Sequence, residues 1–563
     1  MNNIDIKEAL ASADVLYKSG NIEGAFELYQ LITQHSPRTS EAWFNLGVLC
    51  TDLQRFDLAE NFFQEALKWN RKNPDFFNAL GETQFRLGKF AEAGETFEKA
   101  LKRNPASLRA INNLGRLNLE QQHYLAAERE FTRALKLAPK TPQIMLNLSS
   151  VFIDTERFEE ARKLLERAIT LAPEDMMLRY NLARVDHFTG QSEKAIETCR
   201  ESLKTELAPY LASLFRNLLG TIHQNRNEFE LAEENYLQAL EINPQQAETH
   251  TSLGLLRVIL GRLDTGWSEL AWVINKNRYF NQFQSPGWAG ESLEGKRLTC
   301  IAEQGVGDEL LYANMFPELI KSTGHCTIEC DQRLIPLFSR SFPEADFIAR
   351  QKPPLPALVE NPADFITWGS NSASHMRSTL EKFPARPGYL TPSAERVVYW
   401  RQKLQAIDGN AKVGICWRSM VTSAHRRSTY SSIVDDWDAL LTNEKLTFIN
   451  LQYDKCDHEL AAIREKLGVT VHNLDLDLMD DFDEVAALME ALDVVISSHT
   501  AIAALSGAVG KETHVLTTPY NWTMLGTDGF PWYPNSQANV LQPGQPWSDM
   551  ISDLAQRLTL KYC

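Results

Sequence analysis

The stretch EAWFNLGVLCTDLQRFDLAENFFQEALKWNRKNPD, residues 41–75, holds the pattern that decides the fold of the first half of the chain. It places the small residues Gly47 and Ala59 and the aromatic residue Phe63 within two helix-type runs. Small residues let two helices cross closely, and a large residue fills the space beside the crossing. The stretch therefore predicts a pair of packed helices.

The same pattern recurs along the chain at an almost constant interval. The residues equivalent to Gly47 are Ala13, Gly47, Gly81, Gly115, Ser149, Ala183, Gly220 and Gly254. Their successive steps are 34, 34, 34, 34, 34, 37 and 34 residues. The series equivalent to Ala59 and Phe63 keep the same register. Prolines such as Pro105 and Pro139 follow the second helix of a pair, because proline cannot continue a helix.

Three matched series in one register identify the tetratricopeptide (TPR) repeat, with eight units over roughly residues 5–277. One repeat cannot bury its own apolar face, so neighbouring repeats are expected to stack into a superhelix. The single 37-residue step places three extra residues near Leu203–Pro209, where we predict a longer turn.

Asparagines occupy equivalent positions in the first helices of several repeats. They are Asn45, Asn113, Asn147 and Asn181, with Ala79 interrupting the series. A side-chain amide offers two donors and an acceptor, so such a ladder can bind the backbone of an extended peptide. The arrangement resembles the asparagine ladder of O-GlcNAc transferases. Asparagine is also common here in TPR repeats generally, so a purely structural role is the alternative.

Composition limits the classes of function. The chain has 563 residues and a formal net charge of −16, which disfavours a nucleic-acid-binding surface. Its 8 cysteines are dispersed without a CxxC pair, which predicts reduced thiols in a cytoplasmic protein. The N-terminus lacks the pattern of a secretion signal, and no run approaches about 18 apolar residues. We therefore expect a soluble cytoplasmic protein with no membrane span.

The periodicity changes near residue 280. We predict the TPR array over residues 1–278, a linker over 279–296, one α/β lobe over 297–400 and a second over 401–563. Strand-type runs are RLTCIA, CTIECD, KVGICW, LTFINL, VTVHNL, DVVISS and THVLTT, and helix-type runs separate them. Strands that alternate with helices predict parallel, doubly wound sheets. Residues 355–410 are rich in proline and weakly patterned.

The α/β half carries an ordered series of short motifs. They are W-x-G-x-x-L-x-G-K-x-L, AEQGVGDELLYA, VGICW, HRRS, DDFDEVAALMEALDVVISSHTAIAALSGAVGK and PWYP. The series resembles the glycosyltransferase domain of bacterial TPR proteins related to the heptosyltransferases. The resemblance implies a GT-B fold, with two Rossmann-like lobes. With the TPR half, the order of domains resembles flagellin O-glycosyltransferases that use a CMP-linked nonulosonic acid such as pseudaminic acid.

Two residues depart from the pattern of that family. Where the family often has Asp-Thr-Ala-x-x-His, this chain has His499 in place of the aspartate and Ala504 in place of the histidine. Thr500 and Ala501 are kept. These departures imply a different donor, or a different way of holding its ribose and phosphates.

Asp308 closes the turn that follows the first strand of the α/β half. Ligands of open α/β sheets bind at the carboxyl ends of the strands, so this carboxylate can face a substrate. Glycosyl transfer to a hydroxyl needs a base for its proton, and the resemblance gives that role to Asp308. The alternative is a helix N-cap. Gly305 and Gly307 let the backbone approach a ligand.

Basic residues follow a later strand. Trp417 and Arg418 end KVGICWR, and Arg426 and Arg427 lie in the same loop. Guanidinium groups can stabilise the charge that grows on a departing phosphate. We predict that these residues contact the donor. A solvated basic loop is the alternative.

The segment Ser498-His499-Thr500-Ala501 opens a helix after the strand DVVISS. A helix N-terminus offers free N–H groups to an anion, so this segment is the second predicted phosphate site. His499 is either a donor contact or a structural residue.

The run LDLDLMDDFDE resembles the DxD metal motif of other glycosyltransferases, but we predict no metal there. Asp475 and Asp477 flank a strand end, and Asp481 or Asp483 is expected to cap the following helix.

Together with the repeats, the resemblance thus implies a metal-independent protein O-glycosyltransferase. A nucleotide sugar, CMP- or UDP-linked, is its co-substrate, and no other cofactor is expected. The TPR array captures a protein acceptor such as flagellin and presents its Ser or Thr hydroxyls. Two alternatives stay open: an enzyme of the UDP-GlcNAc type, and a non-catalytic TPR adaptor with a degenerate transferase domain.

Overall fold

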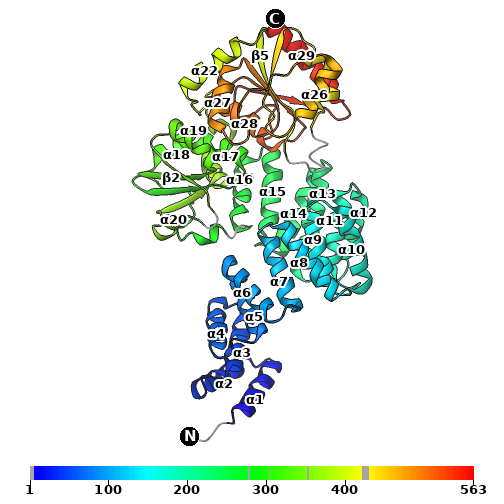
Figure 1. Cartoon of the computed structure of the whole chain (residues 1–563), viewed down its shortest axis with the longest axis vertical. Coiled ribbons are helices and arrows are strands. Elements are labelled where there is room, and N and C mark those ends of the chain that lie inside the picture. Colours follow the sequence, from blue (N-terminus) through cyan, green and yellow to red (C-terminus); the bar gives the residue numbers. More distant parts are fainter. Residues whose placement is uncertain (1–4, 277–278, 304, 352–353, 421–429, 563) are drawn as a thin grey trace. The chain divides into compact units, whose positions relative to one another are not determined.

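The computed structural model describes residues 5–562, apart from 277–278, 304, 352–353 and 421–429. Contacts within the chain divide it into two compact units, Met1–Leu207 and Ala208–Cys563 (Figure 1). We call them the repeat unit and the α/β unit. The packing boundary lies before the predicted boundary at residue 278, because the last helix pair shares its buried core with the α/β part.

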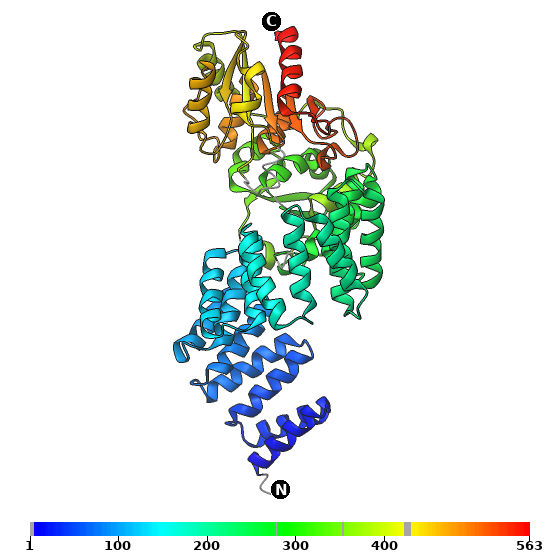
Figure 2. The same ribbon diagram turned by 90° about the vertical axis from the view of Figure 1, so that its right-hand side faces the viewer.

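The repeat unit is built from consecutive helix pairs, which Figure 2 shows in chain order. Its helices are α1 (Ile6–Lys18), α2 (Ile22–His35), α3 (Ser40–Asp52), α4 (Phe56–Trp69), α5 (Pro74–Arg86), α6 (Phe90–Arg103), α7 (Leu108–Glu120), α8 (Tyr124–Leu137), α9 (Pro142–Asp154), α10 (Phe158–Leu171), α11 (Met176–Phe188) and α12 (Ser192–Leu203). A Cβ at Gly47 of α3 would lie 2.5 Å from the ring of Phe63 in α4. This close approach confirms the predicted crossing of small and aromatic residues.

The extra residues of the 37-residue step lie mainly in a helix and not in the predicted longer turn. Helix α13 (Pro209–Asn225) has 17 residues, whereas the equivalent helix α11 has 13. Most of the insertion therefore extends a helix. The extension coincides with the start of the α/β unit at Ala208.

The α/β unit begins with α13, α14 (Phe229–Ile242), α15 (Ala247–Ile259) and α16 (Leu263–Leu270). Val258, Leu263 and Trp267 belong to the same buried cluster as residues of both sheets. Helices α15 and α16 therefore contribute to the core of the α/β unit.

The first lobe has a parallel sheet of four strands in the order β3-β2-β1-β4. The strands are β1 (Arg297–Ile301), β2 (His325–Cys330), β3 (Asp346–Ala349) and β4 (Phe365–Trp368). The helices after them are α17 (Val306–Tyr312), α18 (Phe316–Ser322), α19 (Ile335–Ser341), α20 (Pro356–Glu360), α21 (Gly369–Met376) and α22 (Ala394–Gln405).

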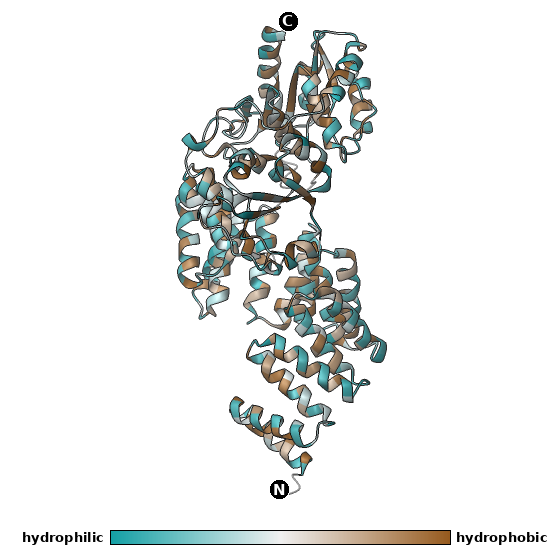
Figure 3. Cartoon of the chain, turned by 90° about the vertical axis from the view of Figure 1, so that its left-hand side faces the viewer, coloured by the Kyte–Doolittle hydropathy of each residue, from teal (hydrophilic) through white to brown (hydrophobic). Residues whose placement is uncertain are grey.

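The second lobe has a parallel sheet of five strands in the order β6-β5-β7-β8-β9. The strands are β5 (Ala411–Cys416), β6 (Leu446–Asn450), β7 (Val494–Ser498), β8 (Thr513–Thr517) and β9 (Ser536–Val540). The helices are α24 (Ile433–Asp436), α25 (Asp438–Leu441), α26 (Asp457–Leu467), α27 (Phe482–Ala491), α28 (Ala501–Val509) and α29 (Trp547–Tyr562). The strands β5 to β8 are buried along their whole length, and Figure 3 colours them mostly as hydrophobic.

The sequence identified the most apolar strands and missed others. The predicted strand VTVHNL contributes only an isolated bridge between Ile449 and His472. The observed strands β3, β4 and β9 were not predicted. Strands β3 and β4 have only 4 residues each, and β9 (Ser536–Val540) is mostly polar in sequence.

Candidate functional site

Two helices that start at strand ends of different lobes meet in the α/β unit. Helix α17 follows β1, and helix α28 follows β7. A Cβ at Gly307 would lie only 3.6 Å from the Cα of Ala501. The structure thus brings the predicted turn of Gly305, Gly307 and Asp308 beside the predicted Thr500–Ala501 segment, although nearly 200 residues separate them in the sequence.

Asp308 lies in the first turn of α17 and is partly exposed. The N-cap position belongs to Gly305, whose turn has no side-chain cap, so the alternative of an Asp308 N-cap is not observed. The negative charge of Asp308 helps to hold the pKa of the buried Tyr312 and Tyr533 hydroxyls above their ordinary value, after burial as the main cause. Its carboxylate therefore lies near two buried phenols.

Two further glutamates that the sequence analysis did not select as the base lie beside this turn. Glu303 is buried and its Oε2 accepts hydrogen bonds from the N–H and the hydroxyl of Ser370, both at 2.7 Å. Glu309 accepts a hydrogen bond of 2.7 Å from the N–H of Asp331. Burial raises the pKa of Glu309 to about 7. Glu303 follows β1, and Glu309 lies in the first turn of the next helix, α17. Their position after the carboxyl end of β1 is the sequence signal that could have identified them.

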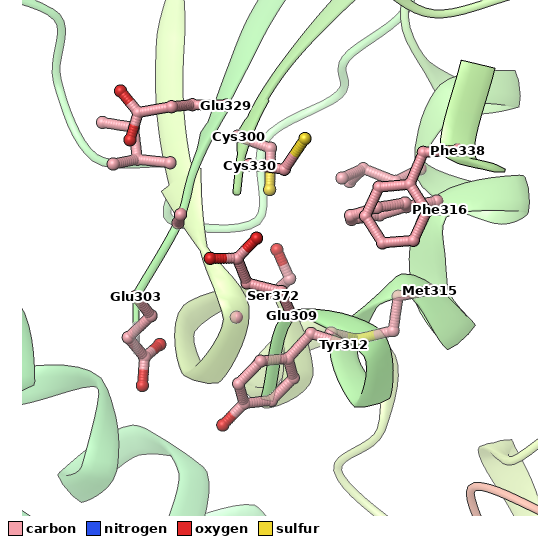
Figure 4. Close-up of a pocket in the computed structure, with 14 residues that line it drawn as sticks. Cys300, Glu303, Glu309, Tyr312, Met315, Phe316, Glu329, Cys330, Phe338 and Ser372 are labelled. Carbon is pink, nitrogen blue, oxygen red and sulfur yellow. The ribbon is translucent and has the colours of Figure 1, made fainter. Parts of the chain in front are cut away.

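A cavity of about 30 Å³ lies under this end of the first sheet (Figure 4). The side chains of Glu303, Glu309 and Tyr312 line it together with Cys300 and Cys330. This volume suits about one water molecule. The cavity is therefore an internal feature of the first lobe and is too small for a sugar.

The Thr500 hydroxyl caps α28. Its oxygen accepts a hydrogen bond of 3.2 Å from the N–H of Ile502 and lies 3.3 Å from the hydroxyl of Ser497. The hydroxyl of Ser498 is buried and donates to the carbonyl oxygen of Trp417 at 2.6 Å. Ser498 therefore joins β7 to the end of β5, and its donor contact stays a prediction.

Trp417 and Arg418 have partners within the second lobe. The Trp417 ring is fully buried in the second lobe and donates from Nε1 to Glu459 at 2.9 Å. The Arg418 guanidinium pairs with Asp454 and, at 2.6 Å, with Glu459. The two carboxylates hold the guanidinium at the end of β5, and the phosphate contact of Arg418 stays a prediction. Arg426 and Arg427 lie outside the described residues.

Gln452, which follows β6, holds the end of β5 in place. Its Oε1 accepts from the N–H groups of Trp417 and Arg418, each at 3.1 Å. Its Nε2 donates to the Arg418 carbonyl oxygen at 2.9 Å. The sequence analysis missed this residue, because the pairing of β5 with β6 decides its role.

His499 lies at the junction of β7 and α28 and is partly buried. Its Nε2 lies 3.0 Å from the hydroxyl of Thr523, and its ring is parallel to Phe530, with the two centroids 6.5 Å apart. The histidine is thus held in a defined position by the segment after β8.

The acidic segment has structural partners. Asp477 accepts from the N–H groups of Met479 and Asp480 at 3.0 Å, which closes a turn. Asp481 caps α27, as one of the two predicted alternatives, whereas Asp483 pairs with Arg340 of the first lobe. In the described part of the chain, no three His, Cys, Asp or Glu side chains are placed to hold a metal ion.

The predicted asparagine ladder lies in the repeat unit and is hydrogen-bonded. Asn113 donates to Asn78 of the preceding repeat at 3.2 Å, and Asn147 donates to Asn112 at 2.8 Å. Asn45 donates to Asp14 at 3.2 Å, and Asn181 donates to the carbonyl oxygen of its own helix at Met177. The amides of Asn45, Asn113 and Asn147 therefore link neighbouring repeats. Each still has hydrogen-bonding capacity, since an amide carries two donors and two acceptor lone pairs.

No helix among the described residues is both long and apolar enough to cross a membrane.

Known proteins resemble this chain over part of its length. Protein FlbA of Caulobacter vibrioides is 34% identical over 320 residues, which are 53% of this chain and 53% of FlbA. The chain thus spans about half the length of this relative. A TPR protein from Parabacteroides merdae covers 45% of this chain and 98% of its own, with 20% identity and a TM-score of 0.40. YrrB, a TPR protein with an unusual peptide-binding site, has 20% identity and a TM-score of 0.27, and covers 30% of this chain and 88% of its own.

The tetratricopeptide-repeat family matches residues 10–75, 78–142, 112–175, 146–212 and 215–246. These matches coincide with the helix pairs that the 34-residue interval predicts. The protein is therefore a TPR-containing protein, with the repeats followed by an α/β part built on two parallel sheets.

Proposed function

We propose that the chain is a protein O-glycosyltransferase of GT-B type, in which the TPR repeats capture the acceptor. The observation that carries this proposal is the contact of Gly307 with Ala501. It brings a partly exposed carboxylate, Asp308, next to the N-terminus of α28. The two doubly wound parallel sheets support the GT-B assignment, since ligands of such sheets bind at the carboxyl ends of the strands.

In the proposed reaction, a Ser or Thr hydroxyl of the acceptor attacks the anomeric carbon of the donor sugar. Asp308 takes the proton of that hydroxyl as the new C–O bond forms. The bond between the sugar and the nucleotide phosphate breaks, and the phosphate leaves with the electron pair. The backbone N–H groups at the start of α28, with Arg426 or Arg427, stabilise the departing charge without a metal.

The proposed donor is a CMP-linked nonulosonic acid, and the proposed acceptor is a flagellin-type protein. The domain order and motif series support this choice, with a UDP sugar as the alternative donor. The cysteines of the described residues are unpaired and buried, which supports a reducing compartment such as the cytoplasm.

A non-catalytic TPR adaptor is the second candidate. The observation that favours it is the internal use of side chains predicted to hold the donor. Trp417, Arg418 and Ser498 all have partners within the second lobe.

A thermal-shift panel with CMP, UDP, GDP and ADP separates these candidates. A cognate nucleotide at about 100 times its Kd adds ~2.7 kcal/mol to the free energy of unfolding. We expect stabilisation by CMP alone. Stabilisation by UDP alone supports the alternative donor, and no shift with any nucleotide supports the adaptor.

The Asp308→Asn variant then tests catalysis. It keeps the size of the side chain and removes the base, so transfer is expected to fall by about 10² or more with nucleotide affinity unchanged. Transfer should also survive EDTA. Restoration of an EDTA-sensitive activity by Mn²⁺ or Mg²⁺ would contradict the metal-free mechanism.

A further inference from the structure

The segment from Thr518 to Phe530, which we call the 518–530 loop, lies between the last repeats and His499. At its start, the ring of Tyr520 contacts the ring of Phe229 in α14, with centroids 4.7 Å apart and an edge-to-face geometry. Further along, the ring of Trp522 contacts the ring of the fully buried Trp267 of α16, with centroids 6.5 Å apart. Two different helices of the repeats therefore hold the loop.

The backbone of the loop also touches the turn between α15 and α16. A Cβ at Gly526 would lie 2.6 Å from the backbone nitrogen of Gly261. Both glycines have positive φ angles, +74° and +75°. Only residues without a side chain allow the two turns to approach this closely. The contact fixes the path of the loop against the eighth helix pair.

On its other side, the loop carries a chain of hydrogen bonds to His499. Asn521 donates from Nδ2 to the Thr517 hydroxyl at 2.9 Å. Its Oδ1 accepts from the N–H of Thr523 at 3.1 Å, and an N–H can only donate, so this contact fixes the orientation of the amide. The same Oδ1 accepts from the Thr523 hydroxyl at 2.9 Å.

The Thr523 hydroxyl has one hydrogen, and Asn521 takes it. The His499 Nε2 that lies 3.0 Å from the same hydroxyl must then carry a proton and donate it. Thr523 is 3% exposed, so water does not readily replace this bond. In the neutral ring, Nδ1 is then the acceptor.

We propose that the 518–530 loop is a positioning element through which the last two TPR repeats hold His499 in its Nε2–H tautomer at the candidate donor site. Thr523 is the positioning residue that sets this tautomer. The assignment of His499 to a donor site rests on the proposed function, whereas its positioning by the repeats does not. The last two repeats and the candidate donor site are thereby joined through one short segment.

The tautomer provides the first test. The ring nitrogens of His499 are observed by NMR in the full chain labelled with ¹⁵N-histidine, and His499→Gln identifies the signal. We expect the Nε2–H tautomer in the wild type and in Thr523→Ser, and a mixture in Thr523→Val, which keeps the shape and loses the hydroxyl. An unchanged tautomer in Thr523→Val overturns the proposal, as does a change in Thr523→Ser.

The contact with the repeats provides the second test. Phe229→Ala removes the aromatic contact with Tyr520 and should increase amide hydrogen exchange over residues 518–526 and broaden the His499 signal. Phe158→Ala, at the equivalent position of α10 in the repeat unit, is the matched control and should leave both unchanged. Unchanged exchange and signal in Phe229→Ala overturn the role of the repeats.

Nucleotide binding separates this inference from the proposed function. For whichever of CMP and UDP binds the wild type, Thr523→Val should raise Kd about fivefold, the effect of one hydrogen bond. If neither nucleotide binds the wild type, the proposed function fails, while the tautomer and exchange measurements still decide the positioning of His499.

Discussion

Trp267 of the last repeat helix donates a hydrogen bond from Nε1 to the carbonyl oxygen of Arg377 in the first lobe, over 3.0 Å. The indole is fully buried and also contacts Trp532, with ring centroids 5.9 Å apart. A helix of the repeat pattern thus completes the core of the α/β part. A fragment of residues 280–563 lacks this indole, so a fragment for study of the α/β part should begin at Ala208.

Trp267→Ala should destabilise the α/β unit by about 3–5 kcal/mol, because it removes a buried indole and leaves the Arg377 carbonyl without its partner. Urea unfolding followed by amide hydrogen exchange of α17 and α21 measures the loss. Trp69→Ala is the control, since Trp69 is 45% exposed on the repeat unit, and a loss of about 1 kcal/mol or less is expected. Equal losses would contradict the packing role of Trp267.

Glu309 should make stability depend on pH. Burial raises its pKa from 4.5 to about 7, so the folded state binds a proton more tightly than the unfolded state. This stabilisation is fully present below pH 4.5 and is lost as the pH rises toward 7. Glu309→Gln cannot ionise and can still accept the Asp331 N–H. Relative to wild type, it should therefore gain stability on the order of 1–3 kcal/mol between pH 4.5 and pH 8.

Urea unfolding at several pH values between these limits measures the difference. Glu95→Gln is the control, because the Glu95 side chain is 74% exposed in the repeat unit. A difference between wild type and Glu309→Gln that does not change with pH would show that the Glu309 pKa is not raised.

Arg418 and Arg426 should respond differently to replacement. Arg418→Ala leaves Asp454 and Glu459 without their cation, so a loss of stability of about 1–3 kcal/mol is expected. Arg426→Ala should weaken nucleotide binding and turnover with stability near wild type. Arg426→Lys should recover only part of the binding, because a point charge replaces a bidentate contact. Calorimetric nucleotide binding and thermal unfolding of the three variants check the difference.

Two variants can separate peptide binding by the asparagine ladder from its role in linking the repeats. Asn113→Ala removes both the bond to Asn78 and the candidate contact with an acceptor peptide, whereas Asn78→Ala removes only the bond. Both variants should lose about 1 kcal/mol of stability. Only Asn113→Ala should weaken acceptor binding, measured by calorimetry with a flagellin-type acceptor. Equal binding by the two variants would assign the ladder to the scaffold.

The sequence was sufficient for the repeats because their contacts are local. Gly47 and Phe63 are 16 positions apart, so one 34-residue interval already contains both residues of the helix crossing. The strands β5 to β8 were also recognisable, since strands buried on both faces are continuous apolar runs. Asp308 and Ala501 each follow such an apolar run, so both could be placed at the carboxyl end of a strand and in the same predicted site.

The sequence by itself determined the repeats, the most apolar strands and the residues at their carboxyl ends. Only the tertiary structure decided which of those residues are engaged by the protein itself. Arg418 meets Glu459, and His499 meets Thr523, across 41 and 24 positions of chain. Pairings of this kind depend on strand order and on how loops pack, which no local pattern encodes. The packing of Trp267 in the core of the α/β unit also depends on the tertiary structure. A helix that satisfies the repeat pattern can bury its outer face against any apolar neighbour.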